Sequence, residues 1–125
     1  MKRILIIEDN TDIRENLEEY LMLCHFEVII AQDGEEGLVK IQEDLPHLIL
    51  CDIAMPKMDG FQVLQQIRSD DRTVDIPFVF ITSSAQKKDM EKGMSVGANA
   101  YLTKPFQMQE LTNVINQFVK EKVTQ

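Results

Sequence analysis

Three apolar stretches of the chain end on side chains that could do chemistry together. The polar residues that follow them are Glu8 and Asp9 after residues 4–7, Asp52 after residues 48–51, and Thr82 after residues 78–81. Uninterrupted apolar runs of this length are typical of strands that are buried on both faces of a sheet. If these strands lie parallel and adjacent, three carboxylates and a hydroxyl meet at one edge of the sheet.

Such a cluster of carboxylates needs a cation. Two like charges about 4 Å apart repel by roughly 4 kcal/mol at an effective dielectric constant near 20. Hard oxygen ligands and retained water favour Mg2+, which often bridges a carboxylate and a phosphate. An aspartate such as Asp52 can also act as a nucleophile towards phosphorus and form an aspartyl phosphate. Lys104 and the Thr82 hydroxyl could then offset the charge of the phosphoryl oxygens.

Strand-like and helix-like segments alternate five times, with connections of only a few residues. Strands are predicted over residues 3–7, 26–31, 48–52, 78–82 and 99–103. Helices are predicted from a cap at Asn10 or Thr11 to Cys24, over 35–43, around 61–67, around 90–96 with Gly97 at the end, and from Met108. The periodicity puts Arg14 on the solvent face of the first of these helices, and Met90, Met94 and Val96 mark the fourth. This rhythm predicts an α/β fold, a flavodoxin-like three-layer sandwich with a five-stranded parallel sheet in the order 2-1-3-4-5 and five helices.

Composition and charge narrow the function classes. The 125 residues, 44% of them hydrophobic, predict a single domain over residues 1–125 with a core of its own. The net charge of -8 argues against direct nucleic-acid binding. The first apolar run is too short for a signal peptide or a membrane span, which favours the cytoplasm, and Cys24 and Cys51 show no ligand spacing.

Five short motifs in this order resemble a response-regulator receiver domain. They are Glu8-Asp9, Asp52 with Met55-Pro56 and Asp59-Gly60 behind it, Thr82, Gly97-Ala98 through Tyr101, and Lys104-Pro105-Phe106. The similarity extends from about Lys2 to Lys120, nearly the whole chain. Each motif alone is weakly specific, but their combination at successive strand ends is highly specific.

The resemblance implies a function and roles for individual residues. Asp52 would accept a phosphoryl group from a phosphohistidine on a sensor histidine kinase or a histidine phosphotransfer protein. Asp9, Asp52 and the carbonyl of Ala54 would ligate Mg2+, while Glu8 would hold a water of the metal. Thr82 and Tyr101 would shift together on phosphorylation and alter the face made by the fourth helix, the fifth strand and the fifth helix, where a downstream protein would bind. The Lys104-Pro105 bond is usually cis in such proteins.

Some positions depart from the commonest family pattern. Glu8 is one methylene longer than the aspartate often found there, and Ser83 stands where alanine is usual. Ala54 and Ser84 occupy positions that, in receivers, tune the water attack that removes the phosphoryl group. Neither side chain is an amide or an acid that could position the water, so the sequence does not predict the phosphorylated lifetime.

The sequence thus predicts a phosphorylatable regulatory domain rather than an enzyme, one that catalyses only its own phosphorylation and dephosphorylation. It fits both a stand-alone regulator and the N-terminal part of a longer protein. One rival is a small Mg2+-dependent phosphatase with an aspartyl nucleophile. Such enzymes need a second acid near the nucleophile, and Ala54 stands at the second position after Asp52. The other rival is a receiver fold that acts only as an unphosphorylated binding module, which the intact set of acidic residues, Thr82 and Lys104 disfavours.

Overall fold

The structure, a computed structural model, describes residues 1–83 and 87–119. Within these residues, five strands form one parallel sheet in the order β2-β1-β3-β4-β5. The strands are β1 (Arg3–Ile7), β2 (Glu27–Ala31), β3 (Leu48–Asp52), β4 (Phe78–Thr82) and β5 (Ala100–Thr103). The predicted parallel sheet and its strand order are therefore confirmed.

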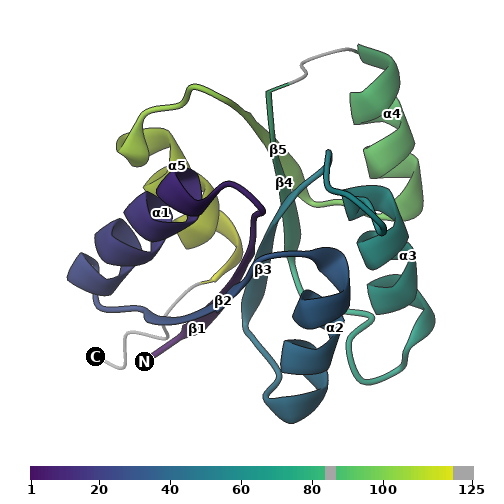
Figure 1. The fold of residues 1–125 in the computed structure, drawn as a ribbon, viewed down its shortest axis with the longest axis horizontal. Helices are drawn as coiled ribbons and strands as arrows, with labels where there is room; N and C mark the ends of the chain where they lie inside the picture. Colours follow the sequence, from purple (N-terminus) through teal and green to yellow (C-terminus); the bar gives the residue numbers. More distant parts are fainter. Residues whose placement is uncertain (84–86, 120–125) are drawn as a thin grey trace.

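Helices cover both faces of this sheet (Figure 1). They are α1 (Thr11–Leu23), α2 (Gly34–Glu43), α3 (Gly60–Ser69), α4 (Lys87–Val96) and α5 (Met108–Phe118). The helices α1 and α5 lie on one face, and α2, α3 and α4 lie on the other. Among the described residues, no helix combines the length and the apolar composition that crossing a bilayer requires.

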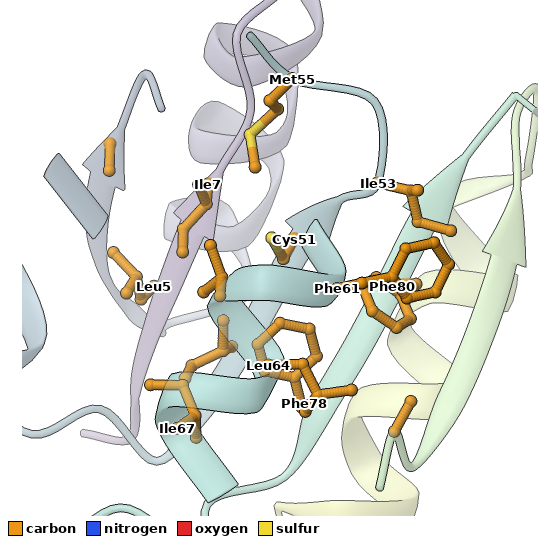
Figure 2. Packing of buried hydrophobic residues seen from close by; sticks show 14 of the residues in the cluster. Leu5, Ile7, Cys51, Ile53, Met55, Phe61, Leu64, Ile67, Phe78 and Phe80 are labelled. Atoms are coloured by element: carbon orange, nitrogen blue, oxygen red, sulfur yellow. The ribbon is translucent and has the colours of Figure 1, made fainter. Parts of the chain in front are cut away.

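The central strands are apolar throughout because they are buried on both faces. Side chains alternate between the faces of a strand. In β1, Leu5 and Ile7 pack in the cluster under α2 and α3, whereas Ile4 and Ile6 pack in the cluster under α1 and α5. Figure 2 shows the first cluster, in which Phe61 of α3 lies against Phe80 of β4. The two clusters hold the sheet between the helices and fix the positions of the strand ends.

Three helices begin at side chains that cap their free backbone N–H groups. The side chain of Asn10 accepts a hydrogen bond from Ile13 N, so the predicted alternative of Asn10 or Thr11 is decided for Asn10. Asp33 caps α2 in the same way. Asp59 and Gln62 form a reciprocal capping box at the start of α3. Two of these caps, Asn10 and Asp59, lie in the loops that follow β1 and β3.

The helix α4 differs from its predicted packing. Of the three apolar residues that mark this helix in the sequence, Met90 and Met94 are 37% and 52% exposed, whereas Val96 packs against the core. Among the described side chains, the helix approaches the core through Val96 and through Gly93, which is buried. Its predicted end is confirmed, since Val96 is the last helical residue and Gly97 has a φ of 116°.

Candidate functional site

The predicted site residues lie at the carboxyl edge of the sheet. Glu8 and Asp9 follow β1, Asp52 ends β3, Thr82 ends β4, and Lys104 follows β5. Because β1, β3, β4 and β5 are parallel and adjacent in this order, their ends lie next to one another. The structure therefore brings together the residues that the sequence selected.

Side-chain alternation divides these residues between the two faces of the sheet. Glu8, Asp52 and Lys104 continue the positions of Ile6, Leu50 and Leu102, which pack in the cluster under α1 and α5. Thr82 instead continues the positions of Phe78 and Phe80, which pack in the cluster under α3. The two carboxylates and the ammonium thus share one face, and the hydroxyl belongs to the other.

Lys104 joins the two buried carboxylates. Its Nζ donates to Glu8 Oε1 at 2.8 Å and to Asp52 Oδ2 at 3.4 Å. The lysine side chain is 17% exposed, that of Asp52 8%, and that of Glu8 is fully buried. The Lys104 backbone N–H donates to the Thr82 carbonyl at 2.7 Å, and the following bond to Pro105 is cis. This backbone link holds the root of the lysine beside the end of β4.

The Glu8 carboxyl group is buried and strongly perturbed. Burial raises its pKa from 4.5 to about 7, although the hydrogen bonds from Lys104 Nζ and from the Asn10 backbone N–H at 3.1 Å act in the opposite direction. The nearby charge of Asp52 adds to the rise. Around neutral pH, Glu8 therefore sits close to the point where it gains or loses a proton.

The pKa of Lys104 is also raised. Burial alone would lower it, but the hydrogen bond to Glu8 and the charges of Asp52 and Glu8 outweigh the burial. The Lys104 ammonium is therefore charged around neutral pH.

The loop after β3 holds Asp52 close to the start of α3. Gly60 N–H donates to the Ile53 carbonyl at 2.9 Å, and a Cβ at Gly60 would overlap the carbonyl oxygen of Asp52. Only glycine lets the helix begin this close to the strand. The Ala54 backbone N–H faces Asp52 Oδ1 at 3.4 Å, while Ala54 itself is exposed. The nearly buried Asp52 carboxylate therefore lies next to an exposed residue of the loop.

The acidic residues fit a divalent cation. Glu8, Asp9 and Asp52 can each offer one carboxylate oxygen such that the three atoms lie within 4.8 Å of one another. Oxygen-only donor sets of this kind suit Mg2+. One ammonium against three carboxyl groups also leaves the cluster short of positive charge, which a divalent cation would supply.

The two predicted switch residues lie one strand apart. Thr82 is buried at the end of β4, and Tyr101 in β5 is half-buried with its ring centroid 5.3 Å from that of Phe80. Ser83 is exposed. Ser84, at the second predicted lifetime-tuning position, lies outside the described residues.

Sequence reasoning missed Arg14 as a residue of the site. It was assigned to the solvent face of the first helix, but it is half-buried and its Nη1 donates to the Glu8 carbonyl at 2.8 Å. Its position in the second turn of a helix that starts directly after Glu8-Asp9 was the available signal. The Asn10 N–H bond to Glu8 Oε2 was missed too, because a backbone donor leaves no mark in a sequence.

Comparison with known proteins identifies the family. Residues 4–116 match the family described as the response regulator receiver domain. The chain belongs to this family. The receiver domain is 40% identical over 111 residues to the DNA-binding dual master transcriptional regulator RpaA of Synechocystis sp., and the match covers 89% of this chain but only 46% of that protein. The match thus spans less than half the length of this curated relative, which is a transcriptional regulator.

Solved structures agree with the fold. The receiver domain matches the chemotaxis protein CheY4 of Vibrio cholerae with a TM-score of 0.91 and 28% identity, over 95% of this chain and 99% of that one. It also matches the receiver domain of the sensor histidine kinase PA1611 of Pseudomonas aeruginosa with a TM-score of 0.88 and 27% identity, over 96% and 98% of the two chains. That receiver domain holds a magnesium ion in its active-site cleft. This chain is therefore a flavodoxin-like receiver domain of two-component signalling.

Proposed function

We propose that Asp52 accepts a phosphoryl group from a phosphohistidine of a sensor histidine kinase or a histidine phosphotransfer protein. The observation that carries this proposal is the bridge from Lys104 Nζ to both Glu8 and Asp52, beside carboxylate oxygens that fit a divalent cation. A carboxylate oxygen of Asp52 attacks the phosphorus, and the bond from phosphorus to the imidazole nitrogen breaks. The histidine keeps the electron pair of that bond and takes up a proton.

The residues of this chain position and neutralise the incoming group. The Lys104 ammonium lies within reach of Asp52 and offsets the negative charge that a phosphoryl group brings. Thr82 ends the neighbouring strand, so that its hydroxyl can donate to a phosphoryl oxygen. Two hydrogen bonds hold the loop after β1 in place: the Arg14 side chain donates to the Glu8 carbonyl, and the Asn10 backbone N–H donates to the Glu8 carboxylate.

Asp9, Asp52 and the Ala54 carbonyl would hold Mg2+ directly, with Glu8 on a water of the metal. When bound, Mg2+ supplies positive charge that stabilises the phosphoryl oxygens during transfer. The receiver domain of PA1611, which holds magnesium in its cleft, supports this assignment. Glu8 can adopt either protonation state near neutral pH, so its ionised form is available to the hydrated cation.

Thr82 and Tyr101 form the proposed switch. Thr82 shares its sheet face with Phe80, whose ring lies 5.3 Å from that of Tyr101. A phosphoryl group that draws the Thr82 hydroxyl towards Asp52 changes the space at this end of β4, and Tyr101 responds. The proposed output is a change of the α4–β5–α5 face, which a downstream protein recognises. The net charge of -8 supports a protein partner rather than direct binding of this chain to nucleic acid.

The observations favour this regulatory role over the two rivals. A phosphatase would need a second acid placed to protonate a leaving group, and the second residue after Asp52 is the exposed Ala54. A binding module that is never phosphorylated would have no use for a buried Glu8 and Asp52 held by one ammonium, an arrangement that costs desolvation. We propose that the domain catalyses only its own phosphorylation and dephosphorylation.

Intact-mass analysis after incubation with a small acyl phosphate and Mg2+ tests the proposal. We expect the mass of one phosphoryl group to be gained, the gain to be lost with a chelator, and no gain for Asp52→Asn. Asp12→Asn is the matched control, because Asp12 is an exposed acid in the first turn of α1. A gain that survives in Asp52→Asn, or rapid phosphate release from a monoester, would contradict the proposed role.

A further inference from the structure

The middle of α4 carries a buried glycine that faces the aromatic ring of Tyr101. A Cβ at Gly93 would overlap Tyr101 Oη and would lie 2.8 Å from Tyr101 Cζ and 2.9 Å from Phe80 Cε2. Real Cβ atoms essentially never come this close to a neighbour. Glycine inside a helix lowers helix stability relative to alanine. Gly93 thus places a residue of low helix propensity at the point of α4 that lies against the Tyr101 hydroxyl.

The rings of Tyr101 and Phe80 both lie against Gly93. The ring centroids of Tyr101 and Phe80 are 5.3 Å apart, and Phe80 lies in turn 5.2 Å from Phe61 of α3. Figure 2 shows Phe61 and Phe80 packed against each other in the core. Phe80 is fully buried and cannot yield without disturbing the core. Any side chain at Gly93 must therefore displace either α4 or the tyrosine ring.

The C-terminal half of α4 is fixed in place. The Gly93 carbonyl accepts hydrogen bonds from Gly97 N at 3.1 Å and Ala98 N at 2.9 Å, which closes the helix end. Arg68 of α3 donates to the Gly97 carbonyl through Nε at 3.1 Å and Nη2 at 2.9 Å. Lys92 Nζ lies 4.4 Å from the centroid of the Phe61 ring. The helix is thus tied to α3 on both sides of Gly93, through Lys92 before it and Gly97 after it.

The side chain on the other side of the notch at Gly93 belongs to Tyr101. It lies in β5, an edge strand of the sheet, and its side chain is half-buried. A ring at this position can rotate about its Cα–Cβ bond towards solvent without breaking the sheet. We therefore expect the Tyr101 ring to respond to a side chain at Gly93 more than α4 does.

We propose that Gly93 is a positioning residue that holds Tyr101 in its inward position. The inward ring needs the notch that the missing side chain leaves, so a side chain at this position turns Tyr101 outward without phosphorylation. This inference rests on the proposed switch role of Tyr101, and it assigns to α4 the feature that sets the resting state of the switch. The α4–β5–α5 face at rest is then defined by Gly93.

Tyrosine fluorescence offers a direct test. The chain has two tyrosines and no tryptophan, so Tyr20→Phe leaves Tyr101 as the only tyrosine. In this background, Gly93→Ala should raise the acrylamide quenching constant towards that of the urea-unfolded chain. Met94→Ala, at the neighbouring exposed position, should leave it unchanged. An unchanged quenching constant in folded Gly93→Ala would overturn the inference, because α4 would then have moved instead of the ring.

A stability cycle covers the case in which Gly93→Ala folds poorly. We expect Gly93→Ala to lower the melting temperature by more when Tyr101 is present than in a Tyr101→Ala background, where only the close contact of the new methyl group with Phe80 remains. Equal losses in both backgrounds would show that Gly93 serves only α4 or Phe80, and would refute the inference. Phosphorylation of Asp52 is measured separately, by intact mass. The two proposals can therefore fail independently: Gly93 can hold Tyr101 even if Asp52 accepts no phosphoryl group, and Asp52 can accept one even if Gly93 does not hold Tyr101.

Discussion

The Mg2+ affinity of the site should depend steeply on pH, because Glu8 must give up its proton to face a hydrated cation. With a pKa of about 7, roughly a tenth of Glu8 is ionised at pH 6 and roughly nine tenths at pH 8. If only the ionised form supports the metal, the apparent dissociation constant for Mg2+ is about tenfold weaker at pH 6 than at pH 8. Burial of the Glu8 carboxyl group is the main cause of this dependence.

Without added metal, the Glu8 proton makes the free energy of unfolding depend on pH in the opposite sense: it falls as the pH rises. The folded-state pKa lies above 4.5, so the folded protein binds more protons than the unfolded chain between pH 4.5 and about 7. The contribution of Glu8 to the free energy of unfolding is fully present below pH 4.5 and is lost as the pH rises through about 7. A rise of about 2.5 units corresponds to on the order of 3 kcal/mol at 1.36 kcal/mol per unit. Mg2+ should restore part of this loss at pH 8 and little of it at pH 6.

Calorimetric Mg2+ titrations between pH 6 and pH 8, in two buffers of different ionisation enthalpy, measure both the affinity and the protons released. Glu8→Gln should flatten the pH dependence, and Glu15→Gln, an exposed acid of α1, should leave it as in the parent. The reasoning is refuted if the parent binds Mg2+ equally well at pH 6 and pH 8, or if Glu8→Gln keeps the tenfold change.

Two further predictions concern the ammonium and the start of α3. Lys104→Met should lower the free energy of unfolding by roughly 1–3 kcal/mol at pH 8. The loss should be smaller at pH 6, because a protonated Glu8 no longer needs the cation. Urea denaturation at the two pH values checks this, and an equal loss at both would contradict it. In the same assay, Asp59→Ala should lower the free energy of unfolding by about 1 kcal/mol, because it removes the capping box with Gln62. Asp59→Asn should lower it by only about a few tenths of a kcal/mol, because asparagine can also cap a helix. Equal losses for the two variants would show that the cap is not the cause.

The sequence was sufficient for the sheet and for the residues at its edge. Runs such as residues 48–51 are readable because a strand buried on both faces has apolar side chains at every position, and its first polar residue marks the strand end. A parallel order then brings successive strand ends to one edge. For this reason Glu8, Asp52 and Lys104 could be assigned to one site before any distance was known.

The packing of α4 could not be predicted in the same way. Pattern reasoning expects the buried face of a helix to carry its large apolar residues, which pointed to Met90 and Met94. In the structure these are exposed, because α4 approaches the sheet through Gly93 and is tied to α3 by Lys92 over the Phe61 ring. A glycine that makes room for a tyrosine from another element leaves no periodic signal, since its partner is distant in sequence.

The charged side chains of the site and the side chain of Thr82 belong to opposite faces of the sheet. Glu8, Asp52 and Lys104 gather charge on the face of α1 and α5, whereas the Thr82 side chain shares the opposite face with Phe80, next to Tyr101. The Lys104 N–H bond to the Thr82 carbonyl at 2.7 Å joins the ends of β4 and β5 directly. In the proposed switch, a change of charge at Asp52 that pulls on Lys104 would act on the end of β4, which carries Thr82, and on the end of β5, the strand that carries Tyr101. Charge on one face can thus alter packing on the other without any rearrangement of the sheet.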